Sequence, residues 1–229
     1  MDRQPRRVLA INKHISYTDT VIQAYDLAAQ WSPQVIAESE ELARPVCEQI
    51  QGQHRDFTHL PFVTIDGDDA RDYDDAICAR NADEGWLLQI AIADVSHYVR
   101  PGTELDKAAR SRGNSTYFAD RVIPMLPETL SNDLCSLVPE EDRLAVICSI
   151  TINSSGEIWE WEFDQAWIRS RLRLTYDEVD QYLEKQGERF DRDWGKAVCE
   201  SLDIASRIVL ARQDWCIGTG RIDINFPEI

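Results

Sequence analysis

Residues 64–76 read TIDGDDARDYDDA, and six of the ten positions from 66 to 75 are aspartates. Two like charges about 5 Å apart repel by roughly 3 kcal/mol at an effective dielectric constant of about 20, so such a loop is costly unless cations neutralise it. Carboxylate oxygens are the ligands that Mg²⁺ and Mn²⁺ prefer, and two such ions can support phosphodiester hydrolysis. The stretch therefore predicts a divalent-metal site, and the ordinary alternative is a solvated acidic turn.

A calcium-binding loop is the second alternative for this stretch. The EF-hand template requires glycine at the sixth position of the loop and glutamate at the twelfth. Counted from Asp66, those positions hold Arg71 and Ile77. The template fails, which disfavours a calcium-binding structural domain.

The residues on either side of the acidic stretch predict a sheet. β-Branched and aromatic residues cluster in short runs that are separated by turn-forming residues such as 81–85 and 154–156. The predicted strands are residues 61–66, 75–79, 86–94, 144–152 and 159–167. Three of them lie so close together in sequence that antiparallel pairing around the acidic loop is favoured, and the last two form a hairpin.

Capping residues and proline mark the predicted helices. These helices cover residues 33–42, Thr103 to Arg112 with Gly113 as the stop, a segment that begins at Thr175 with Glu178, and residues 192–214. Residues 49–59 are polar and are expected to form a loop. In residues 168–174, apolar residues alternate with Arg169, Arg171 and Arg173, which predicts three guanidinium groups on one strand face.

The mixed order of these elements predicts an α+β fold, with a mixed or antiparallel sheet and flanking helices. Residues 1–32 show no clear period and are expected to be an N-terminal tail or the end of a preceding linker. The folded domain is then expected over residues 33–229.

Composition indicates a cytoplasmic protein. The six cysteines are scattered without a C-x-x-C pair, which is typical of reduced thiols rather than of a zinc site or disulfides. The apolar run at residues 8–11 is too short for a signal peptide or a membrane span. The net charge of −17 argues against binding nucleic acid through the overall field, but the charge is distributed unevenly along the chain.

Three blocks of sequence resemble the ribonuclease R / ribonuclease II family, and their residues are more similar to those of ribonuclease R than to those of ribonuclease II. Residues 61–76 are similar to the aspartate signature of the family's RNB catalytic domain. Residues 90–99 (IAIADVSHYV) and 123–137 (IPMLPETLSNDLCSL), followed by 141–144 (EDRL), resemble two further blocks in the same order. The resemblance covers roughly residues 33–226, which implies the N-terminal half of an RNB catalytic domain.

The resemblance implies a 3′-to-5′ exoribonuclease that hydrolyses single-stranded RNA to nucleoside 5′-monophosphates with Mg²⁺, or with Mn²⁺. The aspartates that match the family's metal and catalytic residues are Asp66, Asp72, Asp74 and Asp75. Asp68 and Asp69 occupy positions that are not acidic throughout the family, so they are not counted as ligands.

The same resemblance implies RNA contacts outside the acidic loop. Tyr117 falls where the family places a tyrosine that stacks on the 3′-terminal nucleotide, and stacking tolerates any base. Its alternative is a half-buried loop tyrosine. Arg110, Arg112 and Arg121 flank it, either as phosphate contacts or as solvated surface residues.

The family's downstream arginine motif, in a Ser-Pro-Ile-Arg context, is absent from these 229 residues. The resemblance therefore implies a fragment of the catalytic domain, expected to bind metal but to hydrolyse RNA poorly alone. The alternative function is a truncated, catalytically incomplete remnant that binds RNA or a partner. Single-stranded RNA is the expected partner, and no membrane association is expected.

Overall fold

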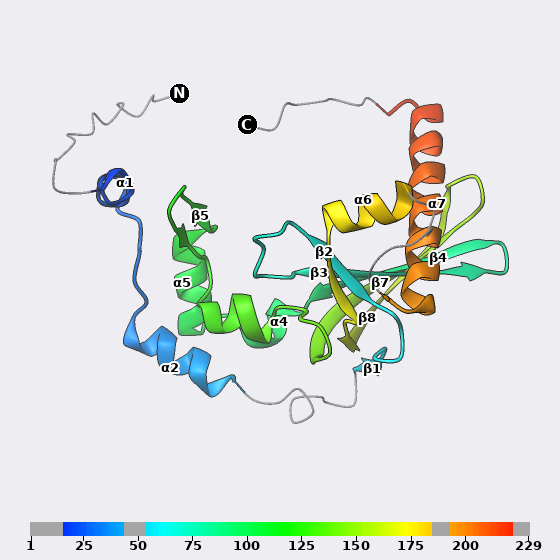
Figure 1. The fold of residues 1–229 in the computed structure, drawn as a ribbon. Helices are drawn as coiled ribbons and strands as arrows, with labels where there is room; N and C mark the ends of the chain where they lie inside the picture. Colours follow the sequence, from blue (N-terminus) through cyan, green and yellow to red (C-terminus); the bar gives the residue numbers. More distant parts are fainter. Residues whose placement is uncertain (1–15, 44–53, 185–192, 222–229) are drawn as a thin grey trace. The chain divides into compact units, whose positions relative to one another are not determined.

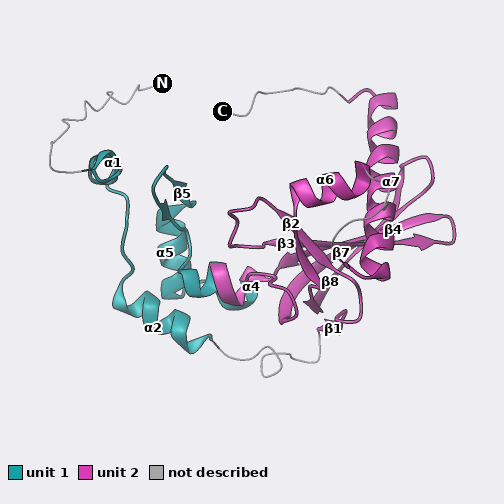
Figure 2. Ribbon diagram, viewed as in Figure 1, with its two compact units in different colours: residues 1–43, 96–131 teal, residues 44–95, 132–229 magenta. Residues whose placement is uncertain are grey.

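The computed structural model describes residues 16–43, 54–184 and 193–221. The chain folds into two compact units (Figure 2). Unit 1 comprises residues 1–43 and 96–131, and unit 2 comprises residues 44–95 and 132–229. In the described part of the chain, no helix is both long enough and apolar enough to cross a membrane.

Unit 2 is built on a seven-stranded sheet with the strand order β1-β8-β7-β4-β3-β2-β9 (Figure 1). The strands are β1 (Arg55–Asp56), β2 (Val63–Asp66), β3 (Asp75–Ala82), β4 (Gly85–Ala93), β7 (Asp142–Ile152), β8 (Ile158–Arg169) and β9 (Leu172–Thr175). The pairs β1–β8 and β2–β9 are parallel, and the other neighbouring pairs are antiparallel. The predicted α+β fold with a mixed, mostly antiparallel sheet is confirmed.

Two helices of unit 2, α6 (Tyr176–Glu184) and α7 (Lys196–Gly218), pack against the sheet. The predicted capping box starts α6: the N–H of Glu178 donates to Thr175 Oγ1 at 3.2 Å, and the N–H of Thr175 donates to Glu178 Oε2 at 2.9 Å. A core of apolar side chains lies between these helices and strands β2 and β9. It consists of Val63, Leu174, Tyr182, Trp194, Val198 and Leu202.

The predicted β7–β8 hairpin is confirmed, and its turn packs closely against α7. Gly156 in this turn has φ +84°, and a Cβ atom added there would lie 2.1 Å from the backbone oxygen of Ala211. Arg212 Nη1 donates to the backbone oxygen of Gly156 at 2.6 Å. Only glycine suits this position, because the positive φ and the close approach both exclude a side chain.

The prediction of one strand over residues 168–174 is wrong. β8 ends at Arg169 and β9 begins at Leu172, and these strands lie toward opposite edges of the sheet. The three arginines therefore do not share a strand face. The alternation of apolar and basic residues is typical of a strand and continues from the end of β8 into β9. The pattern therefore does not indicate that the strand breaks at Ser170.

The described residues of unit 1 form three helices and a short hairpin. They are α1 (Tyr17–Tyr25), α2 (Pro33–Glu41), α5 (Glu104–Arg112), β5 (Thr116–Tyr117) and β6 (Val122–Ile123). Two further short elements cross the boundaries of the units: the helix α4 (Val95–Tyr98) and the π-helical turn η1 (Thr129–Leu134). Helix α2 begins at Pro33 as predicted and ends one residue before the predicted end at Leu42. Helix α1 lies within residues 1–32, where the sequence shows mixed polarity and no clear period.

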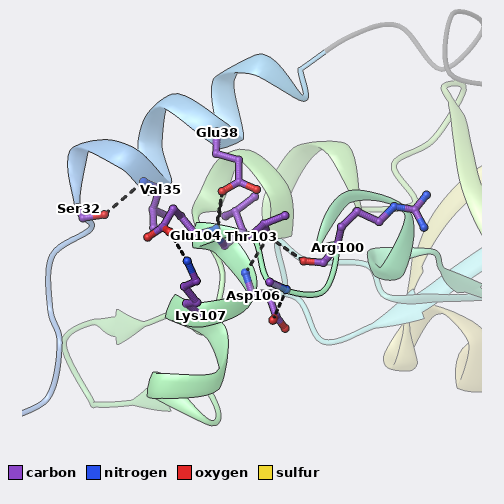
Figure 3. Close-up of polar contacts among 10 residues, drawn as sticks. Ser32, Val35, Glu38, Arg100, Thr103, Glu104, Asp106 and Lys107 are labelled. Atoms are coloured by element: carbon purple, nitrogen blue, oxygen red, sulfur yellow. Dashed lines mark hydrogen bonds and ion pairs between the residues drawn. The ribbon is translucent and has the colours of Figure 1, made fainter.

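A carboxylate from α2 caps α5 (Figure 3). Glu38 Oε2 accepts the N–H groups of Glu104 at 2.9 Å and Leu105 at 3.1 Å, two donors that have no partner within the helix. Thr103 Oγ1 accepts the N–H of Asp106 at 3.2 Å, as the predicted start of this helix requires. The negative charge of Glu38 also suits the positive end of the helix dipole.

Candidate active site

The acidic loop joins the neighbouring ends of two antiparallel strands. β2 ends at Asp66 and β3 begins at Asp75, and the two strands pair directly with Val63 opposite Ile77. Asp72 and Asp74 lie in the loop just before β3. The N–H of Ala93, at the end of β4, donates to the backbone oxygen of Asp74 at 2.8 Å, which fixes the loop where it enters the sheet.

The four carboxyl groups influence one another electrostatically. Burial raises the pKa of Asp66, and the charges of Asp75, Asp72 and Asp74 raise it further, whereas the charge of Arg173 lowers it. The pKa of Asp74 is raised as well, first by desolvation and then by Asp72 and Asp75. The four groups therefore lie within electrostatic reach of one another; their role as metal ligands remains a prediction.

The chemistry of this loop's donor set suits a divalent cation, although no three of its carboxylates, which all lie among the described residues, have oxygen atoms within 4.8 Å of one another in the structure. Asp66 Oδ2 is buried and makes no hydrogen bond. A buried carboxylate oxygen without a partner is destabilising, and a hard cation is a partner that all four carboxylates could share. The raised pKa values of Asp66 and Asp74 share their causes, first desolvation by burial and then the negative charges of neighbouring aspartates.

The segment after η1 holds the loop from one side. The N–H of Tyr73, between Asp72 and Asp74, donates to Ser136 Oγ at 3.0 Å, and the N–H of Leu137 donates to the backbone oxygen of Tyr73 at 2.8 Å. Arg143 Nε in turn donates to the backbone oxygen of Ser136 at 3.0 Å. Residues 141–144 stand out in the sequence as a block that resembles the family. The role of Arg143 could not be predicted from the sequence, because its contact with Ser136 depends on tertiary structure.

Tyr117 lies in unit 1, on the hairpin formed by β5 and β6. It pairs with Val122, and 71% of its surface is exposed. An exposed aromatic ring at a hairpin is compatible with a stacking surface for a base. It does not match the alternative of a half-buried loop tyrosine.

The three arginines near Tyr117 in sequence all have partners within unit 1. The ion pairs join Arg110 to Asp106 at 2.9 Å and Arg121 to Asp19 and Asp120, each at 3.0 Å. Arg112 lies over the ring of Trp31, with Cζ 3.4 Å from the ring centroid, and donates to the backbone oxygens of Pro124 and Gln30. These contacts give Arg112 a structural role, while phosphate binding by the three arginines remains a prediction.

Residues 54–229 match the family model of the RNB domain. The chain belongs to the RNB domain family. Ribonuclease R of Vibrio parahaemolyticus is 46% identical over 176 residues, which cover 76% of this chain and 21% of that relative. The chain thus spans only a small part of the curated relatives that it matches, and the resemblance to the ribonuclease R / ribonuclease II family is confirmed.

Two solved structures of Mycoplasma genitalium RNase R share the fold of this RNB chain at 32% sequence identity. The structure in complex with ribose-methylated single-stranded RNA has a TM-score of 0.84 and covers 92% of this chain and 32% of its own. The structure in complex with double-stranded RNA has a TM-score of 0.82, and the match covers 90% of this chain and 36% of that structure's chain. Nucleases of the RNase R family generally depend on divalent metal ions.

Proposed function

We propose that this chain provides the aspartate-bearing part of the catalytic domain of a 3′-to-5′ exoribonuclease that releases nucleoside 5′-monophosphates from single-stranded RNA. The observation that carries the proposal is the group of four interacting carboxyls at the joined ends of β2 and β3, with the buried, unpaired Oδ2 of Asp66 among them. The RNB family membership and the RNA complexes of the Mycoplasma relative support it. The alternative of a catalytically incomplete binding remnant is not favoured.

In this proposal Asp66, Asp72, Asp74 and Asp75 hold Mg²⁺, or Mn²⁺ in its place. When bound, the ions supply activation of a water molecule and stabilisation of the leaving oxygen. The protein's own contribution is to fix the ligands: Asp66 by its place at the end of β2, and Asp74 by the hydrogen bond from Ala93. Fixed ligands matter because small displacements of reacting groups cost large factors in rate.

The proposed RNA contacts are Tyr117, as a stacking surface for the 3′-terminal base, and Arg110, Arg112 and Arg121, as neighbouring cations. Exposure of the tyrosine ring supports the first role. We place the partial catalytic domain at residues 33–229, preceded by a tail or linker at 1–32, in a cytoplasmic protein. Widely spaced free cysteines among the described residues are compatible with a reducing compartment.

A chimeric enzyme tests the proposal. The segment of this chain that aligns with Vibrio parahaemolyticus ribonuclease R, at 46% identity over 176 residues, would replace the matching segment of that enzyme. With Mg²⁺ and a single-stranded RNA labelled at its 3′ end, the chimera is expected to release labelled mononucleotides, and Asp75→Asn in the chimera is expected to abolish release. A chimera that folds, by circular dichroism and thermal melting, but releases no mononucleotides would refute the assignment.

A further inference from the structure

Arg173 lies on β9, the edge strand that runs parallel to β2. The register places Arg173 beside Thr64 and Thr175 beside Asp66. Because side chains alternate along a strand, the side chain of Arg173 points to the same face of the sheet as that of Asp66. Leu172 and Leu174 point to the other face, where they pack in the core with α6 and α7.

The guanidinium group of Arg173 binds the first residues of the acidic loop. Nη2 donates to the backbone oxygens of Gly67 at 2.5 Å and Asp68 at 3.0 Å. These two residues follow Asp66 directly, so the contact fixes the direction in which the chain leaves β2. Arg173 is a long-range partner for the loop, more than a hundred residues away in sequence.

The same guanidinium group also approaches the returning arm of the loop. Cζ of Arg173 lies 5.8 Å from the ring centroid of Tyr73, which stands between Asp72 and Asp74. The Tyr73 hydroxyl donates to the backbone oxygen of Ala70 at 3.2 Å, which closes the loop on itself. Within the described residues, no ion pair joins Arg173 to an aspartate of the loop.

We propose that Arg173 is a positioning residue that fixes the conformation of residues 67–75. The proposal rests on the metal-dependent function proposed above. The positioning role can be distinguished from an effect of the Arg173 charge, because the two change metal affinity in opposite directions when Arg173 is replaced. A guanidinium charge near the site repels a divalent cation, so loss of the charge alone strengthens metal binding, whereas loss of the loop's shape weakens it.

Arg173→Met in the full 229-residue chain tests this difference in sign. Titration calorimetry with MnCl₂ is expected to show Mn²⁺ binding weakened by about tenfold or more, the usual effect of removing a residue that orients metal ligands. Arg171→Met is the matched control: it removes the same charge two residues away and also a hydrogen bond to a backbone oxygen, that of Thr58, at 2.8 Å. Its Mn²⁺ affinity is expected to stay within about twofold of the wild type, because Thr58 is outside the acidic loop.

A second variant covers the case in which Arg173→Met does not fold. Arg173→Lys keeps the charge but replaces the planar fork by a single ammonium group, which cannot reproduce the guanidinium contacts. It is also expected to bind Mn²⁺ more weakly than the wild type. Wild-type or tighter affinity in either folded Arg173 variant would overturn the proposal.

Hydrogen exchange separates this inference from the proposed function. If the wild type shows no Mn²⁺ binding that Asp75→Asn removes, the metal site itself fails. Exchange of the amides of residues 67–75 in metal-free protein then decides the role of Arg173. Faster exchange in the Arg173 variants than in Arg171→Met is expected, since a loop that loses its anchor opens more often. Equal exchange would overturn the positioning role.

Discussion

Arg143→Met is expected to destabilise unit 2, and the contacts of Arg143 allow the size of the effect to be estimated. The side chain is buried, with 8% of the residue exposed, and it donates to the backbone oxygens of Ser136 at 3.0 Å and Asp142 at 3.2 Å. A hydrogen bond that involves a charged group contributes about 1.5–3 kcal/mol. Loss of the bond to Ser136 therefore costs about 2 kcal/mol, because methionine cannot donate to that oxygen.

The ion pairs of Arg143 add little to this estimate. Its partners Asp133 and Glu141 are 65% and 61% exposed, so water replaces the guanidinium group when it is removed. Exposed pairs contribute roughly 0–1 kcal/mol. The bond to the backbone oxygen of Asp142 adds little because it is longer and only partly buried. Arg143→Met should therefore lower the free energy of unfolding by about 2–3 kcal/mol.

Urea denaturation followed by tryptophan fluorescence measures this loss of stability. Arg55→Met is the control, because Arg55 also forms an ion pair, with Asp164 at 2.8 Å, but its side chain is 56% exposed. A much smaller effect is expected for the control. If the two variants lost the same stability, the argument that the buried hydrogen bond to Ser136 dominates would be wrong.

Three further results are expected. Gly156→Ala should lower the urea midpoint far more than Gly195→Ala, because both glycines have positive φ but only at Gly156 would the new Cβ lie 2.1 Å from a backbone oxygen of α7. Burial raises the pKa of Cys135 to about 12, so iodoacetamide at pH 8 should label the partly exposed Cys216 well before Cys135, as read by mass spectrometry. In the chimeric enzyme, Tyr117→Ala should weaken binding of single-stranded RNA by about 1–3 kcal/mol in a filter-binding titration; unchanged affinity would contradict the stacking role.

Local sequence signals predicted most strands and helices because each depends on neighbours in the chain. The capping box of Thr175 and Glu178 and the stop at Gly113 are such signals, and the structure contains both. The prediction failed where the decisive contact is distant. Arg169 lies on β8 beside Asp142, whereas Arg173 lies on β9, which pairs with β2. Residues 168–174 do not show this division, because the alternation of apolar and basic residues continues from the end of β8 into β9.

The candidate site divides in the same way. The acidic loop could be singled out from the sequence, since its density of aspartates has an electrostatic cost that needs an explanation, and the family resemblance selects four of these aspartates as candidates. The residues that hold the loop could not be found from the sequence. Ser136 and Arg173 bind backbone groups of the loop that are more than sixty residues away in sequence, and Arg143 acts through Ser136. A residue that binds a backbone group leaves no pattern of spacing or residue type at the other end of the contact.

The net charge of −17 is compatible with the RNA binding that we propose. Charges in salt solution act over a Debye length of about 8–10 Å, so RNA at a site responds to the groups around that site and not to the total. In the proposed site two divalent cations would offset the charges of Asp66, Asp72, Asp74 and Asp75, and the phosphate would meet a neutralised centre. Four of the 41 acidic residues of the sequence would then hold the cations that allow an anionic substrate to approach.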